Sequence, residues 1–331
     1  MTNPIVFIVG CPRSGTTLLR HIVSAHRKIT ITPEAHWIPL WFEEKKALTP
    51  EGMITPDFVD QLVEHQKFAL FQTAKEEVLG LVGNGHPQSY ASFVTRIFDL
   101  YGQKRGKALV GNKTPDSARR MHTLHALWPE ARFVHLIRDG RNVALSLMSW
   151  SRVAQKRPGT FSTWKDDPVS TAALWWELNV RRGREAARTL DPKLYFEIRY
   201  ESLIANSEQE CRALCAFLGL PFDDAMLRHQ DERPGLGPKV SAKRDWQPIT
   251  TSMRDWRSEM SSEQVERFEA AGGELLDELG YPRVVPRAKN RNLEDAGRTR
   301  SLLMKYPDWS CMGNYSLDAM GGDIDKASEQ I

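Results

Sequence analysis

Residues 10–19 read GCPRSGTTLL, and this stretch is the strongest single indication of fold class in the chain. It follows an apolar run at residues 5–9 that is typical of a buried strand, and its last four residues begin a helical pattern at residues 16–25. The glycine spacing and the terminal hydroxyl are those of a phosphate-binding loop, GxxxxGK[ST], but Thr16 stands in place of the lysine. Arg13 can supply the missing charge, and the free N–H groups at the start of the helix attract an anion. The alternative is an ordinary strand-to-helix turn capped by Ser14 or Thr16.

Strands and helices alternate along the rest of the chain. The short apolar run before Pro33 reads as a second strand, and further strand-like runs are expected at residues 107–110, 132–137 and 193–199. Helical patterns are expected at residues 116–127, 142–150, 207–218 and 262–279. The alternation predicts an α/β fold, a P-loop-containing parallel sheet flanked by helices. Two helical insertions, residues 56–79 and 169–190, are expected to cap the carboxyl edge of the sheet, where ligands bind in such folds.

The composition is that of an ordinary soluble domain of 331 residues. Lys and Arg exceed Asp and Glu by only 45 to 42, which argues against a nucleic-acid partner and allows local basic patches for a small anion. The four cysteines form no CxxC pair, and the first residues lack the features of a signal peptide or a membrane span, so a cytoplasmic location is expected.

Residues 1–286 form the predicted domain, and the remainder of the chain, residues 287–331, is polar and charged. This composition favours a tail. An arm docked onto the domain is the alternative, through the residues Leu302, Leu303, Tyr306 and Trp309.

A second motif, FVHLIRDGRNVALSLMSW, occupies residues 133–150. It consists of an apolar strand, Arg138 at the strand's end, and a helix in which Ser146 lies one turn beyond Asn142. Arg138 and Ser146 can therefore meet one group, and a phosphate monoester suits such a pair. The structural alternative gives Asp139 to helix N-capping and Arg141 to solvent.

PRSGTTLL at residues 12–19, taken together with LIRDGRNVALS at residues 136–146, resembles the sulfotransferases that use 3′-phosphoadenosine 5′-phosphosulfate (PAPS). The motifs are most similar to the tyrosylprotein and related bacterial or carbohydrate branch. The resemblance implies that the first loop holds the 5′-phosphosulfate, that a second pair holds the 3′-phosphate, and that further residues lie near the nucleotide. Carried over by position, the first loop is Arg13, Ser14, Gly15, Thr16 and Thr17, the pair is Arg138 and Ser146, and the further residues are Tyr200, Ser241 and Lys243.

The resemblance also implies in-line transfer of the sulfuryl group to an acceptor hydroxyl, with PAPS as co-substrate and no metal ion. A sulfuryl group carries less negative charge than a phosphoryl group, so an arginine and a helix N-terminus can suffice. The family's acidic residue after the first helix corresponds to Glu34, the expected general base, although a residue after Pro33 is as often an ordinary helix start. Lys113 in GNKTP is expected to stabilise the leaving oxygen, and its alternative role is a surface ion pair.

His36 and Trp175 are the candidates for contact with the acceptor. Each has a structural alternative: His36 as a hydrogen-bonded neighbour of Glu34, and Trp175 as part of an aromatic core. His36 is also the next candidate for the base. The acceptor itself stays open between a saccharide, a small metabolite, a lipid and a peptidyl tyrosine, and the sequence predicts no oligomeric state.

Two other functions compete with sulfuryl transfer. A P-loop kinase or NTPase would place Asp139 on Mg²⁺ and would need a lysine at the position of Thr16, which argues against it. A non-catalytic nucleotide-binding scaffold would bind the nucleotide without turnover.

Overall fold

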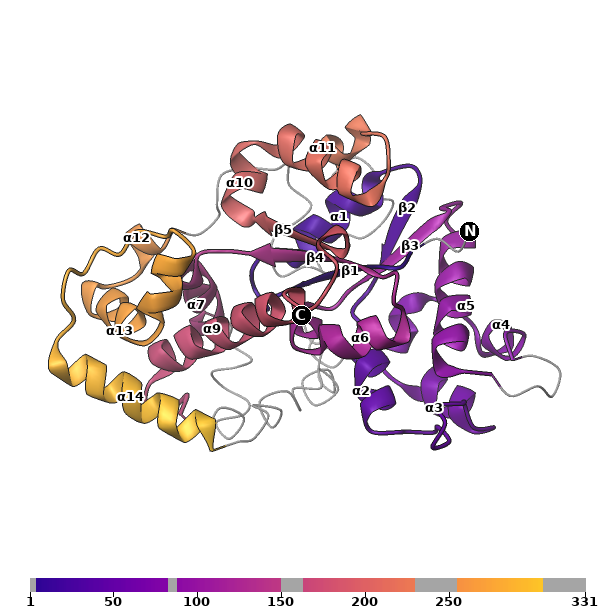
Figure 1. Cartoon of the computed structure of the whole chain (residues 1–331), viewed down its shortest axis with the longest axis horizontal. Coiled ribbons are helices and arrows are strands. Elements are labelled where there is room, and N and C mark those ends of the chain that lie inside the picture. The colour runs from indigo at the N-terminus through magenta and orange to yellow at the C-terminus, as the bar shows by residue number, and fades with distance from the viewer. Residues whose placement is uncertain (1–3, 83–87, 150–162, 230–254, 306–331) are drawn as a thin grey trace, which may run out of the picture.

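Five parallel strands form one sheet in the computed structural model, which describes residues 4–82, 88–149, 163–229 and 255–305. The strands are β1 (Val6–Gly10), β2 (Ile29–Thr32), β3 (Leu109–Lys113), β4 (Arg132–Ile137) and β5 (Tyr195–Arg199). Their order is β2-β3-β1-β4-β5, so β1 is central and pairs with β3 on one side and β4 on the other (Figure 1). The predicted α/β fold with a parallel sheet is confirmed.

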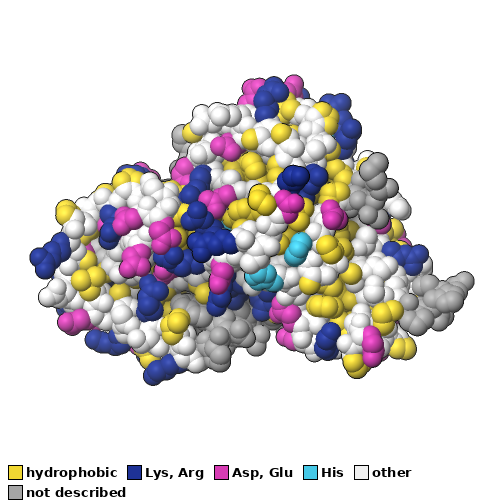
Figure 2. All heavy atoms as spheres, in the orientation of Figure 1, with side chains coloured by type: hydrophobic (Ala, Val, Ile, Leu, Met, Phe, Trp, Pro, Cys, Tyr) yellow, Lys and Arg dark blue, Asp and Glu magenta, His cyan; other side chains and the backbone are white. Residues whose placement is uncertain are grey.

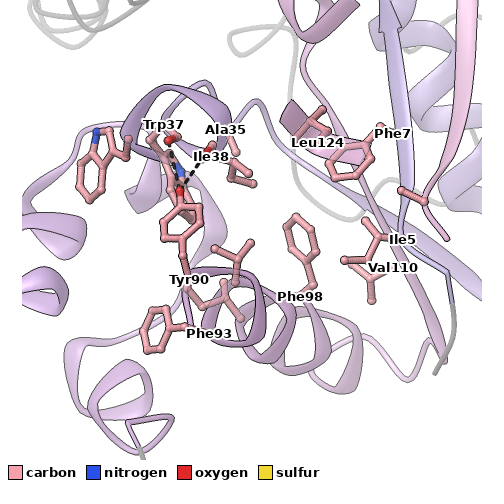
Figure 3. Packing of buried hydrophobic residues seen from close by; sticks show 14 of the residues in the cluster. Ile5, Phe7, Ala35, Trp37, Ile38, Tyr90, Phe93, Phe98, Val110 and Leu124 are labelled. Atoms are coloured by element: carbon pink, nitrogen blue, oxygen red, sulfur yellow. Dashed lines mark hydrogen bonds between the residues drawn. The ribbon is translucent and has the colours of Figure 1, made fainter. Parts of the chain in front are cut away.

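Helices cover both faces of the sheet, because successive side chains of a strand point to opposite sides. Val6 and Ile8 of β1 pack in one apolar layer with α1 (Thr16–Ala25) and α11 (Ser207–Leu218). Phe7 and Val9 belong to the other layer, with α5 (Tyr90–Gln103) and α6 (Met121–Leu127). Figure 3 shows Phe7 and Leu124 converging in this second layer. β1 is buried along its whole length, as a strand covered on both faces must be.

β3 is the strand whose limits differ most from the prediction. It was expected at residues 107–110 but continues to Lys113, because Gly111 and Asn112 pair with Val6 and Phe7 of β1. Residues 111–113, GNK, do not continue the apolar run, so the sequence pattern did not predict that they belong to a buried strand. Asn112 is buried, yet its amide nitrogen donates to the Oγ1 of Thr32 at 2.8 Å, so the polar side chain is satisfied within the sheet.

The helix expected at residues 116–127 is divided in two. A 3₁₀ helix, η2 (Pro115–Arg120), precedes α6. The other described helices are α2 (Trp37–Glu43), α3 (Phe58–Glu64), α4 (Lys75–Leu79), α7 (Gly140–Met148), α9 (Pro168–Ala187), α10 (Tyr200–Ala205), α12 (Trp256–Glu259), α13 (Ser262–Glu278) and α14 (Asn290–Met304), with 3₁₀ helices η1 (Phe68–Phe71), η3 (Pro192–Leu194) and η4 (Asp224–Arg228).

The two helical insertions pack beside elements that begin at the carboxyl edge. The first contains α3, η1 and α4, and its Phe58 and Phe68 contact the aromatic rings of α2. Tyr90 of α5 fixes α2 by donating its hydroxyl to the carbonyl oxygens of Trp37 and Ile38, at 3.3 and 2.8 Å (Figure 3). The second insertion is α9, which packs against α7 and η2.

α14 lies within residues 287–331. Two alternatives follow from the sequence for this segment, a polar tail and an arm docked onto the domain. Leu303 is buried against the layer formed by α9 and α13, whereas Leu302 is exposed. Tyr306 and Trp309, the other two residues of the docked-arm alternative, lie outside the described residues. Arg300 secures the helix by donating to a carboxylate oxygen of Glu177 at 2.7 Å and to the carbonyl oxygen of Ala271 at 2.8 Å. No helix within the described ranges combines the length and the apolar character needed to cross a membrane.

Candidate active site

A candidate residue lies at or just beyond the carboxyl end of each of the five strands. The first loop follows β1, Glu34 lies two residues beyond β2, and Lys113 is the last residue of β3. Arg138 directly follows β4, and Tyr200 directly follows β5. Because the sheet is parallel, these ends share one edge, and residues from five distant parts of the sequence are brought together there (Figure 1).

The first loop has the geometry of an anion cradle. A Cβ on Gly10 would collide with the carbonyl oxygen of Leu136, and Gly15 has φ 98° with its α-carbon against the ring of Tyr200, so neither position accepts a side chain. α1 begins without a side-chain cap and without an acidic residue in its first turn, which leaves its positive end open to an anion. The hydroxyl of Ser14 is buried and has no hydrogen-bond partner in the described structure, as fits a group that awaits a ligand.

The two motifs meet directly, although 133 residues separate them. Arg13 adopts φ 78°, and its Nε donates to the Oγ of the buried Ser146 at 3.3 Å. The guanidinium of Arg138 lies 4.1 Å from the ring centre of Tyr200, the same ring that packs on Gly15. Arg13, which the resemblance places at the sulfuryl end, therefore also reaches the residue assigned to the 3′-phosphate.

Asp139 and Arg141 of the second motif have structural roles. Asp139 caps α7 by accepting from the backbone N–H of Arg141 at 2.9 Å, as the structural alternative predicted. The expectation that Arg141 lies in solvent is wrong: its side chain is completely buried and pairs with Asp139 and with Glu269 of α13, each at 2.8 Å. Trp256 donates its Nε1 to the second oxygen of Asp139 at 3.1 Å. Both oxygens of Asp139 are thus engaged by protein groups, which opposes the Mg²⁺ ligand required by the kinase alternative.

Glu34, Lys113 and His36 form a connected group. The Nζ of Lys113 lies 2.5 Å from one carboxylate oxygen of Glu34 and 3.3 Å from the Oγ1 of Thr17 in the first loop. The Nε2 of His36 lies 3.5 Å from the other carboxylate oxygen of Glu34. Lys113 is buried, so its alternative role as a surface ion pair is wrong: the pair lies at the sheet edge, in contact with the phosphate loop.

The electrostatics keep Glu34 ionised. Burial by itself would raise the pKa of this carboxyl, but the positive charge of Lys113 and the hydrogen bond from His36 outweigh burial and hold the pKa well below its ordinary value. Burial lowers the pKa of Lys113; Glu34 opposes this change, and the positive charges of Arg20 and Lys67 add to it. Lys67 comes from the first insertion, and sequence reasoning missed it because a single lysine in a helical segment carries no signal.

A narrow pocket opens beside His36. Its walls come from the segments that follow β2 and β3, and the lining residues are His36, Pro39, Leu40, Thr114, Asp116, Ser117, Arg119 and Arg120. Trp175, predicted to line the acceptor site, is instead buried in α9 with its ring 4.9 Å from the guanidinium of Arg119. It supports the wall of the pocket from behind, in agreement with its core alternative. Ser241 and Lys243 lie outside the described residues, and their assignment stays a prediction.

Comparisons with known proteins agree with this geometry. The model of the sulfotransferase family matches residues 4–224. Among curated proteins, the chain is similar to the nodulation protein NoeE of Sinorhizobium fredii, with 28% identity over 89% of this chain and 70% of that protein. It is also similar to protein-tyrosine sulfotransferase A of Caenorhabditis elegans, with 24% identity over 69% of this chain and 53% of that protein. The chain thus spans about half the length of this second relative.

Solved structures support the fold. The sulfotransferase domain of the Synechococcus PCC 7002 olefin synthase superposes with a TM-score of 0.54 at 20% identity, over 90% of this chain and 94% of that one. The sulfotransferase domain from the curacin biosynthetic pathway gives 0.51 at 19% identity, over 92% and 98%. With the family model covering two thirds of the sequence, and with both nucleotide motifs assembled at one sheet edge, the chain belongs to the sulfotransferase family, the enzymes that transfer a sulfuryl group from PAPS to an acceptor.

Proposed function

We propose that Glu34 and Lys113 act together in the transfer of the PAPS sulfuryl group to an acceptor hydroxyl. Glu34 takes the proton of the hydroxyl as its oxygen forms a bond to sulfur. The bond between sulfur and the 5′-phosphate oxygen breaks in line, and its electron pair stays on that oxygen, which Lys113 stabilises. The observation that carries this assignment is the 2.5 Å contact between the two side chains beside the first loop.

The same contact links the two roles. In the free protein, the charge of Lys113 is the strongest influence that keeps the pKa of Glu34 low against the opposing effect of burial. A lysine that donates to the leaving oxygen binds the carboxylate less strongly, and Glu34 becomes a better base as charge develops on the leaving group. Base and leaving-group stabiliser are therefore coupled.

The nucleotide is proposed to bind along the carboxyl edge from the first loop to the second motif. The N-terminus of α1 and the buried Ser14 suit the 5′ end, and Arg138 with Ser146 suits the 3′-phosphate. Arg13 contacts Ser146 and lies in the loop itself, so it can serve both phosphates. No step in this scheme needs a metal ion, because the arginines, Lys113 and the helix end supply the positive charge.

The acceptor is proposed to be a hydroxyl compound. The names of two relatives support this class: one acts on protein tyrosine, and another, from Mycobacterium tuberculosis, is the omega-hydroxy-beta-dihydromenaquinone-9 sulfotransferase Stf3, with 24% identity over 86% of this chain. Both acceptors carry a hydroxyl on otherwise unrelated structures.

The test is incubation with radiolabelled PAPS and a panel of saccharides, phenols, alcohols and tyrosine peptides, with the sulfated product identified by mass spectrometry. Transfer by the native chain and its loss in Glu34→Gln support the proposal. Binding of 3′-phosphoadenosine 5′-phosphate (PAP) without transfer to any acceptor favours the scaffold alternative. Thermal stabilisation by Mg-ATP but not by PAP favours the kinase alternative.

A further inference from the structure

The turn that joins β4 to α7 contains only two residues, Arg138 and Asp139. The proposed function gives Arg138 to the 3′-phosphate, so the course of this turn decides where its guanidinium lies. The peptide bond between the two residues is held at both of its polar atoms. Its carbonyl oxygen accepts from the indole Nε1 of Trp176 at 3.0 Å, and its N–H donates to a carboxylate oxygen of Glu201, also at 3.0 Å.

The two partners of this peptide come from opposite faces of the sheet. Trp176 belongs to α9 and is completely buried in the apolar layer of α7, α9 and α13. Glu201 is in the first turn of α10, whose Leu203 packs in the layer of α1 and α11 on the other face (Figure 1). In a trans peptide the C=O and the N–H point in opposite directions, so hydrogen bonds at both atoms oppose rotation of the peptide plane. The ψ angle of Arg138 is therefore fixed from both faces.

The surroundings of both partners preserve these hydrogen bonds. A Cβ on Gly140 would collide with the Trp176 ring, so only glycine at that position lets the indole reach the turn. The second carboxylate oxygen of Glu201 accepts from the hydroxyl of Tyr281 at 2.9 Å. Tyr281 follows α13 and lies beyond residues 4–224, the part of the chain that the family model matches. Glu201 thus connects the turn to the C-terminal part of the described chain.

The start of α10 also contacts the side chain of Arg138. The ring centre of Tyr200, the residue before Glu201, lies 4.1 Å from the Arg138 guanidinium. Glu201 itself is anionic and would repel a phosphate that it faced. Its two oxygens instead accept from the Asp139 N–H and the Tyr281 hydroxyl. Its contacts are therefore those of a residue that orients Arg138 and does not touch the nucleotide.

We propose that Glu201 and Trp176 are positioning residues for the 3′-phosphate: they fix the peptide that follows Arg138 and so direct its guanidinium towards that phosphate. Tyr281 supports Glu201 in this role. The inference rests on the proposed function in one respect only, the assignment of Arg138 to the 3′-phosphate. Because the effect acts through Arg138, loss of Glu201 must reduce only the part of the affinity that depends on this phosphate.

The experiment measures, by calorimetry, the affinity of the full chain for PAP and for adenosine 5′-monophosphate (AMP), which lacks the 3′-phosphate. We expect Glu201→Ala to weaken PAP about tenfold, as for loss of one charged hydrogen bond, and AMP by less than about twofold. Glu201→Gln keeps an oxygen for the Asp139 N–H and an amide that donates to Tyr281, so PAP affinity stays within about threefold of native. Trp176→Phe removes the indole N–H and lowers the ratio of PAP to AMP affinity.

A double-mutant cycle separates positioning from a general structural role. In the Arg138→Ala background, Glu201→Ala should change PAP affinity by less than about twofold, because the arginine through which it acts is missing. Glu266→Ala is the matched control. Its carboxylate also accepts from a backbone N–H, that of Lys289 at 2.6 Å, but at the junction of α13 and α14. Its ratio of PAP to AMP affinity should equal that of the native chain.

The outcomes distinguish this inference from the proposed function. Glu201→Ala overturns the positioning role alone if it weakens PAP and AMP equally, leaves both unchanged, or still weakens PAP in Arg138→Ala. Should Glu201→Ala not fold, Tyr281→Phe leaves the peptide contact in place and removes one hydroxyl, and an unchanged ratio of PAP to AMP affinity overturns the inference. Equal losses of PAP and AMP in Arg138→Ala contradict the proposed 3′-phosphate site itself, and the inference with it.

Discussion

Lys113→Met provides the sharpest test of the proposed pair, because it removes one charge and keeps most of the side-chain volume. The lysine Nζ lies 2.5 Å from Glu34, and its side chain is only 5% exposed. Loss of one donor to a developing oxyanion typically costs about 2.7–4 kcal/mol, so kcat should fall by about 10²–10³. PAP affinity should fall as well, because the 5′-phosphate of PAP carries the leaving oxygen, while Arg138 and the first loop still hold the rest of the nucleotide.

The same variant should change the pH dependence of the reaction. In the native chain the pKa of Glu34 is held well below its ordinary value, mainly by Lys113 and His36 against burial, so the base stays ionised as the pH falls. Without Lys113, burial prevails and the pKa of Glu34 rises. Activity requires the ionised carboxylate, so the acidic limb of kcat/KM should move to higher pH in Lys113→Met.

The pair of Glu34 and Lys113 should also make the free energy of unfolding depend on pH. A carboxyl whose pKa is lower in the folded than in the unfolded protein stabilises the fold above the unfolded value, about 4.3 for glutamate, and loses that contribution as the pH falls through the folded value. At pH 7, Lys113→Met should therefore lose about 1.5–3 kcal/mol, the range for a charged hydrogen bond. We expect the lower part of that range because the Glu34 side chain is 24% exposed. The difference in free energy of unfolding between the native protein and Lys113→Met should become smaller at acidic pH.

Steady-state rates with saturating PAPS across pH, together with urea unfolding at neutral and acidic pH, measure all three effects. Lys75→Met is the matched control, since Lys75 forms an exposed ion pair with Asp60 at 2.8 Å and should change stability by less than about 1 kcal/mol. A Lys113→Met variant with kcat within threefold of native and an unmoved acidic limb would refute the coupling of the two residues.

Three further predictions concern other parts of the site. Glu34→Gln should lower kcat by about 10²–10⁴ with PAP affinity nearly unchanged. If the variant keeps most of its kcat at saturating acceptor, Glu34 is not the base and His36 becomes the candidate. Arg138→Ala should weaken PAP by about 1.5–3 kcal/mol in calorimetry but spare the analogue without the 3′-phosphate; equal losses would contradict the assignment. Arg141→Met should lose about 3–5 kcal/mol in urea unfolding, because Asp139 and Glu269 would remain buried without their partner. A loss below about 1 kcal/mol would show that the buried pairing is not needed.

Charged side chains of both signs lie on the surface of the described part of the chain. Basic and acidic side chains are interspersed on the face shown in Figure 2. Exposed ion pairs of the described residues include Arg182 with Glu185 at 3.1 Å and Arg212 with Glu208 at 2.7 Å. The positive charges proposed to bind the nucleotide, those of Arg13, Lys113 and Arg138, lie at the carboxyl edge of the sheet.

Local patterns of residues were enough to predict several helices and strands. The limits of α1, β4 and α11 agree with the prediction, because an apolar run and a helical period depend on neighbouring residues alone. The glycine spacing of the first loop likewise identified a turn that admits no side chain at Gly15. The parallel sheet then implied that Glu34, Lys113 and Arg138 share one edge, since each follows or ends a strand.

Which of these side chains contact one another, and which charged residues are buried, could be seen only in the folded chain. Arg141 reads as a solvent-exposed helix residue, yet Glu269, 128 residues later, makes its burial possible. The contact of Arg13 with Ser146 depends on the packing of two separate helices against the sheet. A residue pattern reports the preferences of a segment, whereas burial and charge pairing are set by partners far away in the chain, which no local pattern encodes.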